Sequence, residues 1–212
     1  MSNILFDLDG TLVDSKAGII ESIQYALTQL NQTVPDASEL EWCIGPPLKH
    51  YLGKLLNSDE TELIDKAVLL YRKQYSEHGL YNCKLYEGIE ETLKQLVAQG
   101  HKIFVATSKL KPFATRVLFH LAVDHAFSNI YGGEHQGDFH DKRLLIQHAL
   151  ETENLSPSET IMIGDKEHDI LGAKLNEIRS IGASYGYGIG NELNKAGPDH
   201  LISSPQELLD LL

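Results

Sequence analysis

The chain has little cysteine, an excess of acidic over basic residues and no long apolar run. Its two cysteines, Cys43 and Cys83, are too few for a disulfide framework or a zinc site by themselves. Reduced thiols suit a reducing compartment, so the cytoplasm is the expected location. Eighteen lysines and arginines stand against thirty aspartates and glutamates, and a net charge of −12 disfavours nucleic acid as a partner. No apolar stretch approaches the roughly 20 residues that span a bilayer, so no membrane partner is expected.

What the sequence contains is enough apolar material for a sizeable core. Hydrophobic residues make up 42% of the 212 residues, as in ordinary globular proteins. The length fits one domain with an insertion or two unequal domains. From residue 15 to 83 the apolar residues recur at helical spacing, with no convincing strand. From residue 84 onward, helical segments alternate with strands, and this alternation predicts a parallel sheet wrapped by helices.

The sequence therefore predicts an α/β fold with an insertion. Residues 1–14 and 84–212 are expected to form the α/β core, and residues 15–83 an all-helical cap inserted after the first strand. Within the core, strands are expected at 101–106, 129–131, 160–163 and 179–181.

The most informative segment is I-L-F-D-L-D-G-T-L-V-D-S, residues 4–15. Its apolar run ends in Asp7 and Asp9, and Gly10 turns the chain away. If residues 4–6 form a buried strand, alternation places both carboxylates on the same side, about 7 Å apart. One could attack a substrate, the other could carry a proton, and a divalent cation could bind both. A strand that merely ends in an Asp-Gly turn is the simpler alternative.

Further polar groups follow the other predicted strands. Thr107 ends one strand and Asp165 ends another, with Asp169 one helical turn beyond it, while Lys142 opens the helix between them. Open parallel sheets bind ligands at the carboxyl ends of their strands, so these groups should meet at one edge. Phosphoryl transfer through an aspartyl-phosphate needs such a set: a nucleophile, acids for a metal, and donors for the charged oxygens.

These groups lie in four motifs, and two further stretches accompany them. The motifs are D-L-D-G-T-L-V-D-S (7–15), V-A-T-S-K (105–109), Lys142 and G-D-K-E-H-D-I (164–170), and the two stretches are I-G-P-P-L (44–48) and Y-G-Y-G (185–188). In all of them the chain resembles the haloacid dehalogenase superfamily, and most closely its phosphoglycolate phosphatase and 5′-nucleotidase-like hydrolases with a helical cap. The resemblance covers essentially the whole chain. It implies a Rossmann-like core and a Mg²⁺-dependent phosphatase that hydrolyses a small phosphate monoester, phosphoglycolate- or nucleotide-like, through an aspartyl-phosphate.

The resemblance also implies a role for each acid. Asp7 would be the nucleophile, and Asp9 the general acid and then the general base. Asp7, the backbone carbonyl of Asp9, and Asp165 would bind Mg²⁺, with Asp169 ligating directly or standing just behind the ligands. Mg²⁺ prefers oxygen ligands and keeps several waters, so two or three acids suffice. An aspartate at position 9 favours phosphate esters over carbon–halogen bonds, because the superfamily's dehalogenases lack it.

The phosphoryl oxygens are expected to meet cations and hydroxyls of the core. Thr107 and Lys142 would hold them, with Ser108 beside Thr107 in the substrate site. Lys109 is a rival for the phosphate-binding ammonium; we interpret it as a rim or structural charge because Lys142 fits the third motif. Lys166 stands where many relatives have a small residue and is expected to add a positive charge at the rim.

The cap is expected to set substrate specificity, because it is inserted directly after the strand that carries the nucleophile. Its Gly45-Pro46-Pro47 loop is the expected inward loop, which makes Gly45 and Pro46 candidate substrate-binding residues. Arg72 could bind a substrate carboxylate or phosphate, or it could be one of the many arginines exposed on long helices. The expected partner is a small phosphorylated metabolite, and the expected assembly is a monomer or a weak homodimer.

Three alternatives stay open at this stage. A phosphomutase of the β-phosphoglucomutase type shares the core and returns the phosphoryl group to the sugar. A phospho-aspartate signalling module also gathers acids, a threonine and a lysine at strand ends, but a helical insertion after the first strand argues against it. A folded but inactive binding protein is disfavoured because every catalytic group is present.

Overall fold

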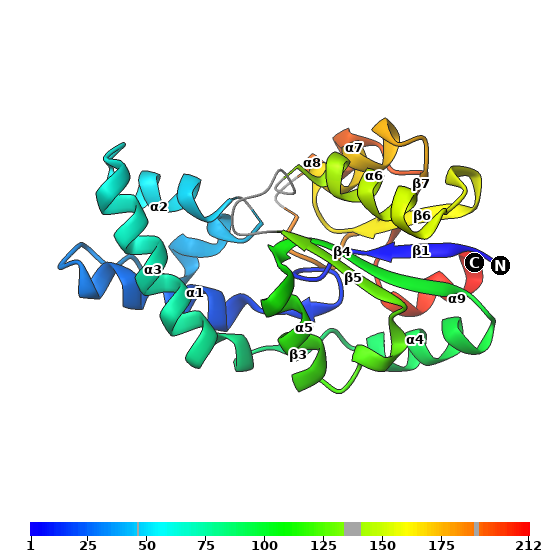
Figure 1. Ribbon diagram of the computed structural model, residues 1–212, viewed down its shortest axis with the longest axis horizontal. Helices are drawn as coiled ribbons and strands as arrows, with labels where there is room; N and C mark the ends of the chain where they lie inside the picture. Colours follow the sequence, from blue (N-terminus) through cyan, green and yellow to red (C-terminus); the bar gives the residue numbers. More distant parts are fainter. Residues whose placement is uncertain (46, 134–140, 189–190) are drawn as a thin grey trace. The chain divides into compact units, whose positions relative to one another are not determined.

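This computed structural model describes residues 1–45, 47–133, 141–188 and 191–212 (Figure 1). These residues divide into two compact units. The first comprises Met1–Asp14 and Lys84–Leu212, and the second comprises Ser15–Cys83. Among the described residues no helix has both the length and the apolar character needed to cross a membrane.

A six-stranded sheet forms the centre of the first unit, and its neighbouring strands all pair in parallel. The strand order is β5-β4-β1-β6-β7-β8. In β1 the side chains of Ile4, Leu5 and Phe6 are fully buried, because the strand has neighbours on both edges and helices over both faces. The strands span β1 Asn3–Phe6, β4 Lys102–Leu110, β5 Asn129–Gly133, β6 Thr160–Gly164, β7 Arg179–Ala183 and β8 His200–Ile202.

Helices cover the two faces of this sheet. Figure 1 shows α6 and α7 on one side of it and α4 and α9 on the other. The helices span α4 Ile89–Ala98, α5 Lys111–His120, α6 Lys142–Glu153, α7 Glu167–Leu175, α8 Glu192–Ala196 and α9 Leu208–Leu211, with 3₁₀ turns η3 Asp124–Ala126, η4 Pro157–Glu159 and η5 Pro205–Glu207.

The buried face of α6 determines where the side chain of Lys142 lies. Leu145, Ile146 and Ala149 share one helical face and are buried against sheet residues such as Phe104. Lys142 lies on that same face, at the N-terminal end of the helix. Packing of the apolar residues therefore brings the lysine to the carboxyl edge of the sheet.

A two-stranded antiparallel ribbon stands apart from the main sheet. It pairs β2 (Val13–Asp14) with β3 (Lys84–Leu85), and the Tyr86 N–H donates to the carbonyl of Leu12 at 3.1 Å. The chain leaves the first unit after Asp14 and returns at Lys84, so both crossings between the units belong to this ribbon.

The described elements of the second unit are helical. Two tyrosines of α3, Tyr71 and Tyr75, stack with ring centroids 5.6 Å apart and are buried with Leu40 and Leu52. Cys43 is buried and Cys83 half-buried, and both are free thiols. The elements span α1 Lys16–Gln29, η1 Ala37–Cys43, α2 Leu48–Leu56, α3 Thr61–Glu77 and η2 Gly79–Tyr81.

The predicted α/β fold with a parallel sheet is confirmed, while several details differ. The strand expected at 101–106 continues to Leu110, with a register shift against β5 between Thr107 and Leu110. Helix α2, the β2–β3 ribbon and strand β8 were absent from the prediction. The ribbon strands are two residues long and β8 three, which is too short for a periodic pattern to show.

Candidate active site

Three buried carboxylates meet at the carboxyl edge of the sheet. Asp7 follows β1 and Asp165 follows β6, while Asp169 lies in the first turn of α7. Asp7 is 6% exposed and the other two are fully buried. One side-chain oxygen from each lies within 4.8 Å of the other two. The sequence placed these acids at one edge of a sheet, and the structure brings them together there.

The absence of a side chain at Gly164 allows Asp169 to lie against the end of β6, close to the other two acids. A Cβ atom on Gly164, the last residue of β6, would lie 2.2 Å from Cγ of Asp169. Asp169 also accepts the backbone N–H of Lys166 at its Oδ2 (3.1 Å), which fixes the carboxylate at the start of α7. The residue is therefore part of the folded helix end as well as of the acidic cluster.

Lys142 supplies the cation at the centre of this cluster. Its Nζ lies 2.7 Å from Oδ1 of Asp7 and 2.7 Å from Oδ1 of Asp169, and it donates to the carbonyl of Ala106 at 2.8 Å. Burial lowers the pKa of this ammonium, but the carboxylates of Asp169 and Asp7 outweigh burial and leave the pKa above its ordinary value. Lys142 is therefore charged at neutral pH.

The cluster holds more acidic than basic side chains. Burial raises the pKa of Asp165 well above its ordinary value, and the charges of Asp7 and Asp169 raise it further. Asp7 and Asp169 share the ammonium of Lys142, while Asp165 accepts hydrogen bonds from the Tyr187 N–H and the Thr11 hydroxyl. Hard carboxylate oxygens in such a group are the ligand set that Mg²⁺ prefers, so the residues present fit a divalent cation.

The second carboxylate of the first motif has a cation of its own. Lys109 Nζ lies 2.6 Å from Oδ2 of Asp9, and the two side chains are 7% and 16% exposed. The backbone N–H of Lys109 donates to Oγ1 of Thr107 at 3.2 Å. Of the two interpretations of Lys109, a rim charge or a structural charge, the pairing with Asp9 fits the structural one: β4 runs beyond its predicted end and carries this lysine inward.

The hydroxyl residues of the second motif lie in β4. Thr107 is 2% exposed and Ser108 is half-buried. Lys142 binds the carbonyl of Ala106, the residue before Thr107, so both predicted phosphate-binding residues lie at the same strand end.

Lys166 is also more buried than the sequence suggested. It is 7% exposed, its Nζ donates to the carbonyl of Tyr187 at 2.8 Å, and the carboxylate of Glu192 lies 3.6 Å away. The expectation of a charge at the rim is wrong, because this lysine turns inward to hold the loop after β7.

That loop supplies a contact that sequence reasoning missed. The backbone N–H of Tyr187 donates to Oδ2 of Asp165 at 2.7 Å, and the hydroxyl of Thr11 donates to Oδ1 at 3.3 Å. The Y-G-Y-G stretch was a visible signal, but nothing in it pointed to an acid 22 residues earlier in the chain.

The predicted substrate-binding residues of the cap lie in the second unit. Gly45 is exposed and has a φ of 109°, a backbone conformation that glycine adopts readily. Arg72 is a half-buried residue of α3. Pro46 lies outside the described residues. The roles proposed for these three residues stay predictions.

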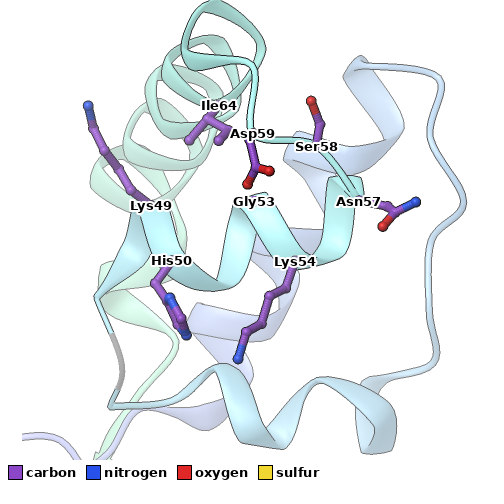
Figure 2. A pocket seen from close by; sticks show the side chains of 8 residues that line it. All are labelled: Lys49, His50, Gly53, Lys54, Asn57, Ser58, Asp59 and Ile64. Carbon is purple, nitrogen blue, oxygen red and sulfur yellow. The ribbon is translucent and has the colours of Figure 1, made fainter.

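The second unit has a hollow of about 440 Å³ beside α2 (Figure 2). Its cations are already engaged: Lys49 lies 2.6 Å from Asp65, and Lys54 lies 5.7 Å from the ring centroid of Trp42. In Figure 2, Lys49 points to one side of α2 while His50 and Lys54 point to the other. These side chains do not converge on one point, so the acidic cluster of the first unit is the stronger candidate for chemistry.

Comparison with known proteins identifies the family of this chain. Residues 4–183 match the haloacid dehalogenase-like hydrolase family. The 5′-nucleotidase of Pseudomonas aeruginosa is 42% identical over 210 residues, which cover 99% of this chain and 95% of that protein. The phosphoglycolate phosphatase of Colwellia psychrerythraea is 30% identical over 214 residues, which cover 97% and 94%. The crystal structure of a predicted phosphatase from Clostridium acetobutylicum has a TM-score of 0.92 at 38% identity, over 100% of this chain and 98% of that one. The chain therefore belongs to the haloacid dehalogenase-like hydrolase family and is an enzyme of its phosphatase group.

Proposed function

We propose that this protein is a Mg²⁺-dependent phosphatase that hydrolyses a small phosphate monoester through an aspartyl-phosphate. The observation that carries the proposal is the position of Asp7: a carboxylate at a strand end, 2.7 Å from a buried ammonium and grouped with two further buried acids. A nucleophile for phosphorus needs such surroundings, because its negative charge must be offset before a phosphate dianion can approach.

In the first step a carboxylate oxygen of Asp7 attacks phosphorus, and the bond between phosphorus and the ester oxygen breaks. Asp9 gives its proton to the departing oxygen, which leaves as an alcohol. In the second step Asp9 takes a proton from water while that water attacks phosphorus. The bond to Asp7 then breaks, inorganic phosphate leaves, and both carboxyl groups return to their starting state.

Residues of the core hold the phosphoryl oxygens. Lys142 supplies a fixed positive charge beside Asp7, and Thr107 and Ser108 supply hydroxyl donors at the end of the neighbouring strand. These groups are set by the fold before substrate arrives, so little reorganisation opposes the reaction. Lys109 holds the Asp9 carboxylate at 2.6 Å and keeps it at the site edge.

Asp7, Asp165 and the backbone carbonyl of Asp9 are the residues that would hold Mg²⁺. Both oxygens of Asp169 are already engaged, one by Lys142 and one by the N–H of Lys166, so we assign Asp169 to supporting the ligands. When bound, Mg²⁺ supplies positive charge that offsets the repulsion between the nucleophile and the phosphate.

The relatives named above suggest the class of substrate. They favour a small phosphorylated metabolite, either nucleotide-like or phosphoglycolate-like. We propose a cytoplasmic enzyme that acts as a monomer or a weak homodimer and binds no nucleic acid. The family match sets aside the phospho-aspartate signalling module, whereas a phosphomutase would use the same core chemistry.

Phosphate release from a panel of esters tests the function. With Mg²⁺ present, we expect inorganic phosphate from at least one nucleoside monophosphate, from phosphoglycolate or from a sugar phosphate. The assay should follow both inorganic phosphate and isomeric phosphate esters. Conversion of a sugar phosphate into its isomer without release of phosphate would identify a mutase and overturn the proposal.

Mg²⁺ binding should depend on pH. Burial raises the pKa of Asp165 from its ordinary 3.8, so the metal-free fold holds this proton more tightly than the unfolded chain does. For this group the metal-free fold loses stability as pH rises through the raised pKa, and regains it as pH falls. Because Mg²⁺ must displace the proton, it should raise the unfolding temperature more at about pH 8 than at about pH 5.5. Thermal unfolding with Mg²⁺ or with NaCl of equal ionic strength measures this, and an equal shift at both pH values would contradict it.

A further inference from the structure

Asp165 and Lys166 bind the backbone of one residue in the loop after β7, Tyr187, on both sides of its Cα. The N–H of Tyr187 donates to Asp165 at 2.7 Å, and the carbonyl of the same residue accepts from Lys166 at 2.8 Å. Asp165 and Lys166 are consecutive residues at the end of β6. The Tyr187 backbone is therefore held directly against the proposed metal ligand.

Two glycines allow the loop to lie this close. A Cβ atom on Gly186 would be 2.2 Å from the carbonyl oxygen of Gly10, and one on Gly188 would be 2.7 Å from that of Asp165. Any larger residue would push the loop away from the turn that follows Asp9 and from the end of β6. The contact between Tyr187 and Asp165 thus depends on the exact alternation in Y-G-Y-G.

The side chain of Tyr187 points to a different part of the first unit. Its hydroxyl donates to Oδ1 of Asp14 at 2.8 Å, and burial raises the pKa of Tyr187, which keeps the hydroxyl protonated as a donor. Asp14 belongs to the β2–β3 ribbon and lies 3.8 Å from Nζ of Lys84 on the other strand. Tyr86, which follows that strand, has its ring centroid 6.4 Å from that of Tyr187.

One residue thus joins the proposed metal ligand to the ribbon through which the chain passes between its two units. We propose that Tyr187 is a positioning residue that couples the orientation of the Asp165 carboxylate to the β2–β3 ribbon. The inference rests on the proposed Mg²⁺ site and adds to it a physical connection to the two chain crossings. Its backbone N–H is hydrogen-bonded to Asp165 and its hydroxyl to Asp14, so a change at either carboxylate alters the position of Tyr187 at the other.

The coupling follows from the geometry that Mg²⁺ requires. Mg²⁺ demands near-ideal octahedral ligands, so a carboxylate that is free to rotate binds it less well. The hydroxyl of Tyr187 anchors the loop whose N–H restrains Asp165, and loss of that anchor loosens the restraint. Linkage is reciprocal: if the ribbon improves Mg²⁺ binding, Mg²⁺ must steady the ribbon to the same degree.

The test uses the full chain and Mg²⁺ alone, without substrate. In Tyr187→Phe the backbone contact to Asp165 stays and only the hydroxyl is lost; we expect Mg²⁺ affinity in a calorimetric titration to fall about fivefold, the lower end of the range for coupled sites. Tyr185→Phe is the matched control: its hydroxyl donates to the carbonyl of Thr11 at 3.0 Å rather than to Asp14, and the substitution keeps the ring that packs against Tyr86. Its Mg²⁺ affinity should stay within about twofold of wild type.

A second variant removes the hydrogen bond between Tyr187 and Asp14 by changing its acceptor in the ribbon. Asp14→Ala removes the acceptor and should weaken Mg²⁺ binding as Tyr187→Phe does. The double variant should be no weaker than the more affected single variant, because both changes delete one connection. Additive losses would overturn the coupling. Unfolding temperatures are measured for the wild type, both single variants and the double variant, so a misfolded variant would be detected.

Hydrogen exchange gives the reciprocal measurement. In the wild type, Mg²⁺ should slow exchange of the Tyr86 amide and its ribbon neighbours; in Tyr187→Phe this slowing should be lost. Three results would each overturn the inference. They are an unchanged Mg²⁺ affinity in Tyr187→Phe, an equal loss of Mg²⁺ affinity in Tyr187→Phe and Tyr185→Phe, and Mg²⁺-dependent slowing of exchange in the ribbon that persists in Tyr187→Phe. If the wild-type chain does not bind Mg²⁺ at all, the proposed metal site itself fails, so the two failures are distinct.

Discussion

Asp7→Asn should reduce phosphate release to below about one hundredth of the wild-type rate, because the amide cannot form the aspartyl-phosphate. The fold should survive the change. Lys142 keeps its second carboxylate, Asp169, at 2.7 Å, and the backbone N–H of Asp7 keeps its bond to the carbonyl of Ile163 at 2.8 Å. Removing one of three crowded acids also relieves repulsion in the metal-free protein.

The measurement is steady-state phosphate release with Mg²⁺, on the best ester from the panel. Asp65→Asn is a matched control: it makes the same chemical change at a partly exposed residue that pairs with Lys49, and it should keep wild-type activity. Mass spectrometry must show that residue 7 is still asparagine, since deamidation would restore the nucleophile. Turnover above a hundredth of wild type in such a sample would reject Asp7 as the nucleophile.

Removal of Mg²⁺ should abolish activity, and addition of Mg²⁺ should restore it. Asp7 and Asp169 share the ammonium of Lys142 and Asp165 lies beside them, so without a divalent cation the site repels a phosphate dianion. Ca²⁺ should substitute poorly, because it takes more ligands in a looser geometry than the octahedral one of Mg²⁺. Chelation followed by titration of each cation measures the requirement.

Asp165→Asn separates the metal site from general charge effects. The asparagine keeps the shape and an oxygen acceptor for the Tyr187 N–H, but it loses the charge that binds the cation. We expect Mg²⁺ affinity to fall by at least about tenfold, with an unfolding temperature equal to or above that of the metal-free wild type. Full activity in excess chelator, or unchanged Mg²⁺ affinity in this variant, would disprove the assigned site.

Much of this protein could be predicted from the sequence because its informative signals are local. A buried strand that ends in an acid places the acid at the sheet edge, and this rule located Asp7 and Asp165. Helical spacing identified the segment that carries Lys142, and the alternation of helices and strands identified a parallel sheet. For these groups, position in a strand or helix is enough to set their place in the fold.

Tertiary structure alone decided how the long side chains and the loops pair. The sequence left Lys109 as a rim or structural charge and placed Lys166 at the rim. In the structure Lys109 binds Asp9 across 100 residues of sequence, and Lys166 holds the loop that contains Tyr187. A lysine has several flexible bonds, so its partner depends on which carboxylate or carbonyl the packed fold brings within reach. The extension of β4 beyond residue 106 likewise depends on pairing with β5, which no local pattern records.

The sequence by itself therefore determined the fold class, the family resemblance and the edge at which the acids gather. The packed structure decided the partners of each charge: Lys142 between Asp7 and Asp169, Lys109 on Asp9, and the Tyr187 backbone on Asp165. The physical reason is distance along the chain. Secondary structure is specified over a few residues, whereas these contacts join strand ends and loops between 22 and 135 residues apart, and they form only once the core has packed.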